Sequence, residues 1–132
     1  MNGKQLKNSI LQWAIQGKLV PQDPNDEPAS VLLERIREEK ARLVKEKKIK
    51  KDKNESIIYR GEDNSYYEKF LATGVVKCID EEIPFEIPRS WEWTRISSIF
   101  QLNPRVEAND DMLAAFIPME AISAVYGSAY HY

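Results

Sequence analysis

Few residues of this chain have side chains suited to covalent chemistry. The sequence of 132 residues contains one histidine, His131, and one cysteine, Cys78. Nucleophilic catalysis needs a serine or cysteine beside a base and a third group that orients the base, and His131 lies at the very end of the sequence. The glycines form no phosphate-binding motif, and no two carboxylates are spaced as an acid–base pair. The sequence therefore predicts no catalytic site.

Cys78 predicts neither a disulfide nor a metal site, because a single cysteine has no internal partner and no set of zinc ligands surrounds it in the sequence. We interpret it as a half-buried, chemically inert strand residue. Elsewhere in the sequence, the adjacent aspartates Asp110 and Asp111 are typical of a solvated loop. We expect no metal and no cofactor, and a single free cysteine fits a reducing, cytoplasmic location.

A cluster of lysines is the strongest candidate for binding a polyanion. Residues 34–53 contain ten Lys or Arg and five Asp or Glu, a balance of +5, whereas residues 54–132 have a balance of −7. Lysines that neutralise phosphates bind nucleic acid without reading its sequence. The candidate contacts are Lys47, Lys48, Lys50 and Lys51. The alternative, a solvated helix end whose interleaved acidic residues weaken the field, fits the sequence equally well.

Two tryptophans, Trp91 and Trp93, follow a proline-rich extended stretch and share one face of an extended chain. Exposed aromatic pairs can stack nucleobases. Directly after Pro84 and Pro88, however, we favour a core role for both rings together with Phe85. The stem of Arg95, on the same face, is expected to cover ring surface.

An amphipathic helix is predicted over residues 4–16. Its apolar positions, Leu6, Ile10 and Trp13, recur at helical spacing, and Trp13 is expected to pack between helices. Gly17 is well placed to end this helix. A connector with three prolines follows over residues 21–28.

A second, highly charged helix is expected from Val31 to Lys51, capped by Asp26 or Ser30. Residues spaced alternately three and four apart form a seam along one side of this helix. The seam is apolar at Leu33, Ile36 and Leu43 and has lysine stems at the other positions, so it predicts at most a weak coiled coil. So narrow a stripe does not stabilise a long helix in water. The helix therefore needs a partner, which is the same chain, another copy or a different subunit.

The pattern changes to strand periodicity after residue 54. Residues 57–59 predict a strand, and residues 66–71 and 75–79 predict a hairpin around Gly74. Residues 97–100 are expected to start a short helix, and residues 114–119 predict a buried strand. The fold class is therefore α+β, a helical arm followed by an incomplete, mainly β domain. We expect four segments, residues 1–20, 21–53, 54–82 and 83–132.

Several of these runs together resemble a known family. Leu6–Gln12, Gly17–Ser30 and Leu33–Ile36 resemble the helical spacer region of type I restriction-modification specificity subunits. Ile83–Trp93 resembles the start of a target recognition domain of that family, and Phe116–Met119 resembles an early strand of it. The motifs stand in the family's order and cover roughly two thirds of the chain.

This resemblance implies a non-catalytic subunit that pairs with methyltransferase and restriction subunits and directs them to a bipartite DNA sequence. In the family, two recognition domains each read one half of the site, and the helical spacers set their separation. The recognition domain here is expected to be incomplete. Asn103 and Arg105, beside Pro104 in a polar loop, are further candidate DNA contacts.

A second reading remains open, a coiled-coil protein-interaction scaffold that does not bind DNA and self-associates through its helices. It rests on the weak seam and the acidic C-terminal part of the chain. No run approaches the roughly 18 apolar residues that a membrane span needs, so no membrane partner is expected. Salt-dependent DNA binding separates the two readings.

Overall fold

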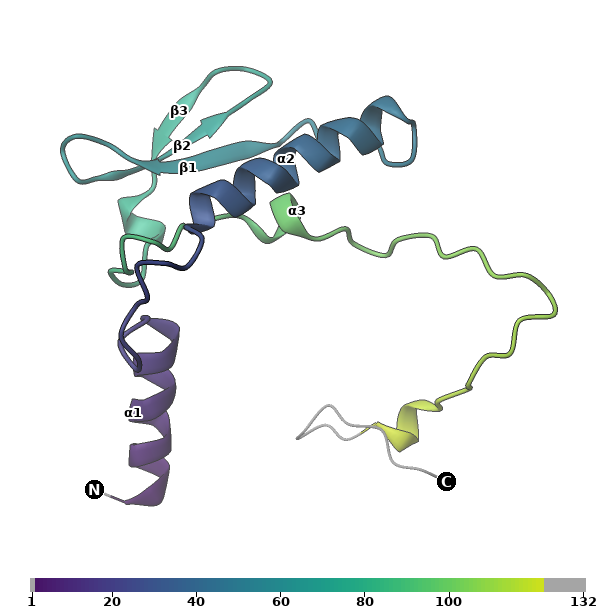
Figure 1. Cartoon of the computed structure of the whole chain (residues 1–132), viewed down its shortest axis with the longest axis horizontal. Coiled ribbons are helices and arrows are strands. Elements are labelled where there is room, and N and C mark those ends of the chain that lie inside the picture. The colour runs from purple at the N-terminus through teal and green to yellow at the C-terminus, as the bar shows by residue number, and fades with distance from the viewer. Residues whose placement is uncertain (1, 123–132) are drawn as a thin grey trace. The chain divides into compact units, whose positions relative to one another are not determined.

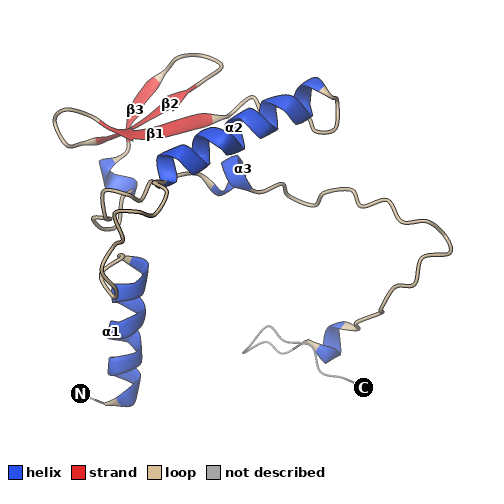
Figure 2. Ribbon diagram, in the orientation of Figure 1, coloured by secondary structure: helices blue, strands red, loops and turns tan. Residues whose placement is uncertain are grey.

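The computed structural model describes residues 2–122 and divides the chain into two units, residues 1–102 and 103–132. The first unit contains the helices α1 (Gly3–Ile15), α2 (Ala29–Lys45) and α3 (Ile96–Ile99), the strands β1 (Ser56–Arg60), β2 (Tyr66–Phe70) and β3 (Val76–Cys78), and the 3-10 turn η1 (Asp80–Glu82), as Figures 1 and 2 show. The second contains a 3-10 turn, η2 (Met119–Ala121). The predicted α+β class is confirmed.

Helix α1 is capped at both ends. Asn2 Oδ1 accepts a hydrogen bond of 2.9 Å from the Gln5 amide, and the Gln5 side chain accepts one from the Asn2 amide in return. This reciprocal pair satisfies two amides that a helix start leaves free. At the other end Gly17 has a φ of +69°, and the Lys18 amide donates to the Trp13 carbonyl at 2.8 Å. Gly17 therefore ends the helix as predicted.

Helix α2 is shorter than predicted and starts differently. It ends at Lys45 rather than Lys51, because Lys47 adopts a φ of +58° and the Ile49 amide turns back towards the Leu43 carbonyl. Ile49 lies one residue out of the seam register, so ending the helix lets it become half-buried. The cap position is Pro28, with no side-chain hydrogen bond from Asp26 or Ser30. The predicted caps were wrong.

The three strands form one antiparallel sheet in the order β1-β2-β3. The predicted first strand and hairpin are confirmed, with Gly74 in the hairpin turn at a φ of +71°. One face of the sheet places Ser56, Tyr66 and Glu68 among the buried residues, together with Ile79 just beyond β3. Helix α2 overlaps β1 in the view of Figure 1, and Lys40 Nζ lies 3.7 Å from Glu55 Oε1, directly before β1. One lysine of the α2 seam thus contacts the same chain.

Two local predictions were wrong. Residues 114–118 form no strand, and Phe116 is 89% exposed. Cys78 is exposed rather than half-buried, because β3 is the short edge strand of the sheet.

Candidate nucleic-acid interface and the Arg95 cluster

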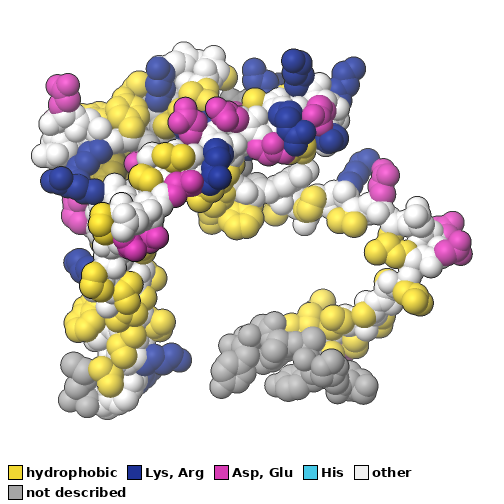
Figure 3. Space-filling model, viewed as in Figure 1, with side chains coloured by type: hydrophobic (Ala, Val, Ile, Leu, Met, Phe, Trp, Pro, Cys, Tyr) yellow, Lys and Arg dark blue, Asp and Glu magenta, His cyan; other side chains and the backbone are white. Residues whose placement is uncertain are grey.

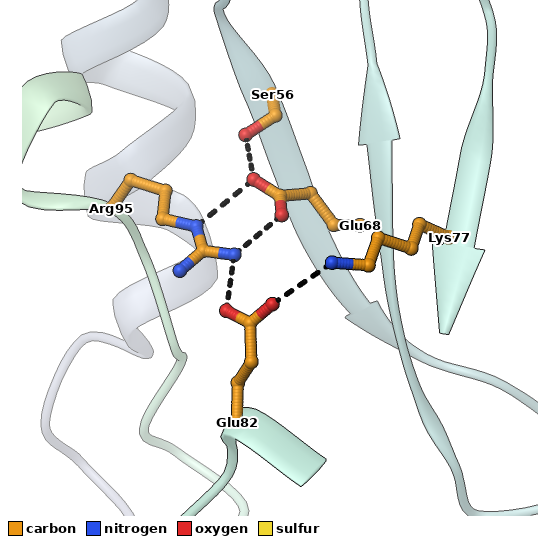
Figure 4. Close-up of polar contacts among 5 residues, drawn as sticks. All are labelled: Ser56, Glu68, Lys77, Glu82 and Arg95. Atoms are coloured by element: carbon orange, nitrogen blue, oxygen red, sulfur yellow. Dashed lines mark hydrogen bonds and ion pairs between the residues drawn. The ribbon is translucent and has the colours of Figure 1, made fainter. Parts of the chain in front are cut away.

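The best-defined polar constellation in the described chain is a cluster around Arg95 (Figure 4). Arg95 Nε and Nη2 donate to the two carboxylate oxygens of Glu68 at 3.0 and 2.6 Å. Arg95 Nη2 also lies 2.7 Å from Glu82 Oε2, and Ser56 Oγ donates to Glu68 Oε1 at 2.5 Å. Lys77 Nζ completes the chain of contacts at 3.2 Å from Glu82 Oε1. The cluster joins β1, β2, β3 and η1 to the segment that leads into α3.

Charge within this cluster is balanced and partly shielded from water. Glu68 is only 4% exposed. The guanidinium of Arg95 lowers the pKa of the Glu68 carboxyl, although burial opposes this effect. The same contacts raise the pKa of Arg95 and, with Lys77, lower that of Glu82. Glu68, Glu82 and Arg95 are therefore charged at neutral pH and satisfied by their contacts, which is the arrangement of a structural ion pair rather than of a general acid or base.

Lysine and arginine side chains gather over the C-terminal part of α2 and the turn that follows it (Figure 3). Lys47, Lys48, Lys50 and Lys51 are all exposed. Lys48 Nζ lies 2.7 Å from Glu46 Oε2, whereas no ion pair involves the other three within the described residues. The structure brings the four predicted lysines together at one helix end, and three of them have ammonium groups that are available to an anion.

Asn103 and Arg105 are exposed, and Asn103 has a φ of +47°. Both belong to the second unit, residues 103–132, whereas the lysines belong to the first. The structure therefore describes a basic cluster at the end of α2 and, separately, an exposed polar loop.

The predicted packing residues divide into two groups. On α2, the half-buried positions include Leu33, Ile36 and Leu43. On α1, Leu6, Ile10 and Trp13 are 52%, 40% and 54% exposed. Within residues 2–122, Trp13 thus does not pack between helices, and the apolar side of α1 lies open.

The aromatic residues of segment 83–93 contact different parts of the first unit. Phe85 and Trp93 pack with their ring centroids 5.3 Å apart and are both half-buried. Trp91 is 37% exposed, and its Nε1 donates to Gln22 Oε1 at 2.8 Å. Trp91 therefore binds the connector between α1 and α2 and forms no aromatic platform with Trp93.

Sequence reasoning missed the Arg95 cluster, since it assigned Arg95 only a covering role over a ring. Glu68 and Glu82 lie 27 and 13 residues from Arg95. The available signal was the alternation in β2, which places the charged Glu68 on the same face as the buried Tyr66. Among residues 2–122, no three potential His, Cys, Asp or Glu ligands come together.

Comparison with known proteins finds two curated relatives. The chain is 42% identical over 130 residues to the type I restriction enzyme EcoAI specificity subunit of Escherichia coli, which covers 98% of the chain. It is also 42% identical over 128 residues, 96% of the chain, to the EcoEI specificity subunit of the same organism. Along almost its whole length, the chain is similar to part of a type I restriction specificity subunit. The resemblance predicted from the sequence motifs is confirmed.

The chain spans 19% and 18% of the lengths of those two relatives. No protein-family model and no solved structure matches it. None of the described helices has the length and apolar character to cross a lipid bilayer.

Proposed function

We propose that this chain serves in the DNA sequence-specificity subunit of a type I restriction-modification complex. In that role it has no catalytic activity of its own and helps to position methyltransferase and restriction subunits on a bipartite DNA site. The observation that carries the proposal is the 42% identity to two specificity subunits over nearly all of the chain. Because such a complex acts on the cell's own DNA, the proposal implies a cytoplasmic protein.

The exposed lysines after α2 support a part in DNA binding. Ammonium groups that contact phosphates release counterions. Each such contact makes the slope of log affinity against log salt concentration steeper by about 0.9. These contacts bind the backbone and carry no sequence information. We therefore propose that Lys47, Lys48, Lys50 and Lys51 strengthen binding without selecting the target, and that Asn103 and Arg105 lie in a loop that approaches the same duplex.

The test is duplex DNA binding in a salt series by the assembled complex that carries this segment. Replacing the four lysines by glutamine is expected to reduce the slope by about 0.9 for each lysine that contacts a phosphate. The matched control replaces four exposed lysines elsewhere in the first unit, Lys4, Lys7, Lys18 and Lys69. Equal slopes for the two variants would reject a phosphate-binding role for the cluster.

A second candidate function is that of an interaction scaffold without DNA contact. The observation that favours it is the open apolar side of α1, where Leu6, Ile10 and Trp13 are exposed. Isolated helices of this length are marginal in water unless an apolar face is packed. A complex that retains its subunits but shows a flat salt response with duplex DNA would favour this function.

A further inference from the structure

The junction where α1 meets the rest of the first unit contains contacts that neither the DNA role nor the α2 seam explains. An added Cβ on Gly17 would lie 2.6 Å from Pro88 Cγ and 3.2 Å from Trp91 Cζ2. The 2.6 Å distance would be a clash, because real Cβ atoms do not lie so close to ring atoms. The C-terminal end of α1 is therefore packed directly against two rings of segment 83–93, with glycine as the residue that allows this approach.

One glutamine side chain connects the three parts of this junction. Gln22 Nε2 donates to the Gly17 carbonyl at 3.2 Å, and Gln22 Oε1 accepts from Trp91 Nε1 at 2.8 Å. The far end of the connector is held as well, because the Ala29 amide donates to the Ser90 carbonyl at 2.8 Å. Both ends of the connector are thus bound to residues 88–91.

The connector between these two points is itself stiff. Pro21, Pro24 and Pro28 fix their own φ angles and restrict the residues before them. Asp23 Oδ1 accepts from the Asn25 amide at 2.8 Å, and the Asp26 amide donates to the Asp23 carbonyl at 3.1 Å. These contacts form an Asx turn, in which an aspartate side chain accepts a hydrogen bond from the backbone two residues further on. A flexible linker is instead rich in glycine and serine and lacks such contacts.

From these contacts we infer that Gly17, Gln22 and Trp91 form a locked junction that holds α1 in one orientation relative to the three-stranded sheet. The apolar side chains of α1 then keep a fixed direction relative to the sheet, because the arm does not swing on the connector. The inference concerns the chain alone, so it holds independently of whether the complex binds DNA.

The experiment measures the distance between two spin labels on the whole chain. One label is attached to the native Cys78, which is exposed on β3, and the other to an Asn8→Cys substitution on the exposed surface of α1. The unmodified junction is expected to give a single narrow distance distribution. A broad distribution in the otherwise native chain would overturn the inference at once.

Junction variants are then compared with a matched control. Gly17→Ala and Gly74→Ala introduce the same side chain at nearly equal φ values, +69° and +71°, but only Gly17 has neighbours within 4 Å. Gly17→Ala is expected to lose the narrow peak, and Gly74→Ala to keep it. Gln22→Leu removes the bridging hydrogen bonds and leaves Gly17 in place, so it tests the junction even if Gly17→Ala unfolds. A narrow peak in Gln22→Leu at the native distance would overturn the assigned role of the bridge.

Discussion

Replacing Arg95 by methionine is expected to destabilise the first unit far more than the same change at a surface arginine. Glu68 is 4% exposed, and three hydrogen bonds to its carboxylate come from Ser56 and Arg95. Removing Arg95 leaves a buried carboxylate with Ser56 alone. Breaking a fully buried ion pair costs about 3–5 kcal/mol. Because the Arg95 side chain is 40% exposed, water can reach the vacated position, and we expect a loss of about 2–3 kcal/mol.

Arg42 provides the matched control. It also bridges two glutamates, Glu39 and Glu46, but on the open surface of α2 and with all three side chains well exposed. Methionine and arginine have similar helix propensities, and exposed ion pairs contribute little to stability, so Arg42→Met should leave the free energy of unfolding almost unchanged. The assay is urea-induced unfolding followed by circular dichroism at neutral pH. Equal losses of free energy in the two variants would refute the claim that the buried carboxylate makes Arg95 special.

The pH dependence of unfolding gives an independent check on the same cluster. Arg95 holds the pKa of Glu68 below its ordinary value of 4.5. A carboxyl whose pKa is lower in the folded state stabilises the fold above its unfolded pKa, and this contribution is lost as the pH falls through the folded value. The native chain should therefore lose stability on acidification below pH 4.5 more steeply than Arg95→Met. Parallel pH profiles for the two chains would contradict the assignment.

Three further predictions concern other parts of the chain. Lys47→Gly should stabilise the chain by about 1 kcal/mol in urea unfolding, because the φ of +58° at Lys47 strains any residue with a Cβ; Lys48→Gly, at an ordinary backbone position, should give no such gain. Tyr67 Oη donates a hydrogen bond to Asp63 Oδ2 at 2.5 Å, and this contact raises the pKa of Tyr67 to about 12. The phenolate absorbance of Tyr67 should therefore appear at lower pH in Asp63→Asn, and an unchanged titration would disprove the contact. Trp13→Gln should weaken assembly of the chain with the other subunits of the proposed complex, without reducing the helix content measured by circular dichroism.

The sequence predicted those parts of the fold that depend on local patterns. Gly17 ends α1 because only a residue without Cβ enters the left-handed region without strain, and Gly74 marks the hairpin turn for the same reason. The seam of α2 followed from the spacing of Leu33, Ile36 and Leu43, which the structure places on its half-buried side. Each of these features depends on residues within a few positions of one another.

The features that the sequence did not reveal depend on residues far apart. The cap of α2 comes from the Ser90 carbonyl rather than from Asp26 or Ser30, since tertiary contact satisfies the Ala29 amide. Arg95 finds Glu68 only when the sheet and the segment before α3 are folded together. The clustering of the four exposed lysines could be predicted from the sequence, because lysines that are close in sequence near one helix end lie close together whatever the tertiary fold is.

The most direct test of the proposed function is a chimera in which residues 1–132 replace the segment of the EcoAI specificity subunit that they match. Assembly with the methyltransferase subunit and site-dependent binding to duplex DNA are measured against the unmodified EcoAI subunit. We predict that the chimera assembles and binds DNA with a salt dependence close to that of the parent. A chimera that folds, as judged by circular dichroism, but neither assembles nor binds DNA would contradict the proposed role.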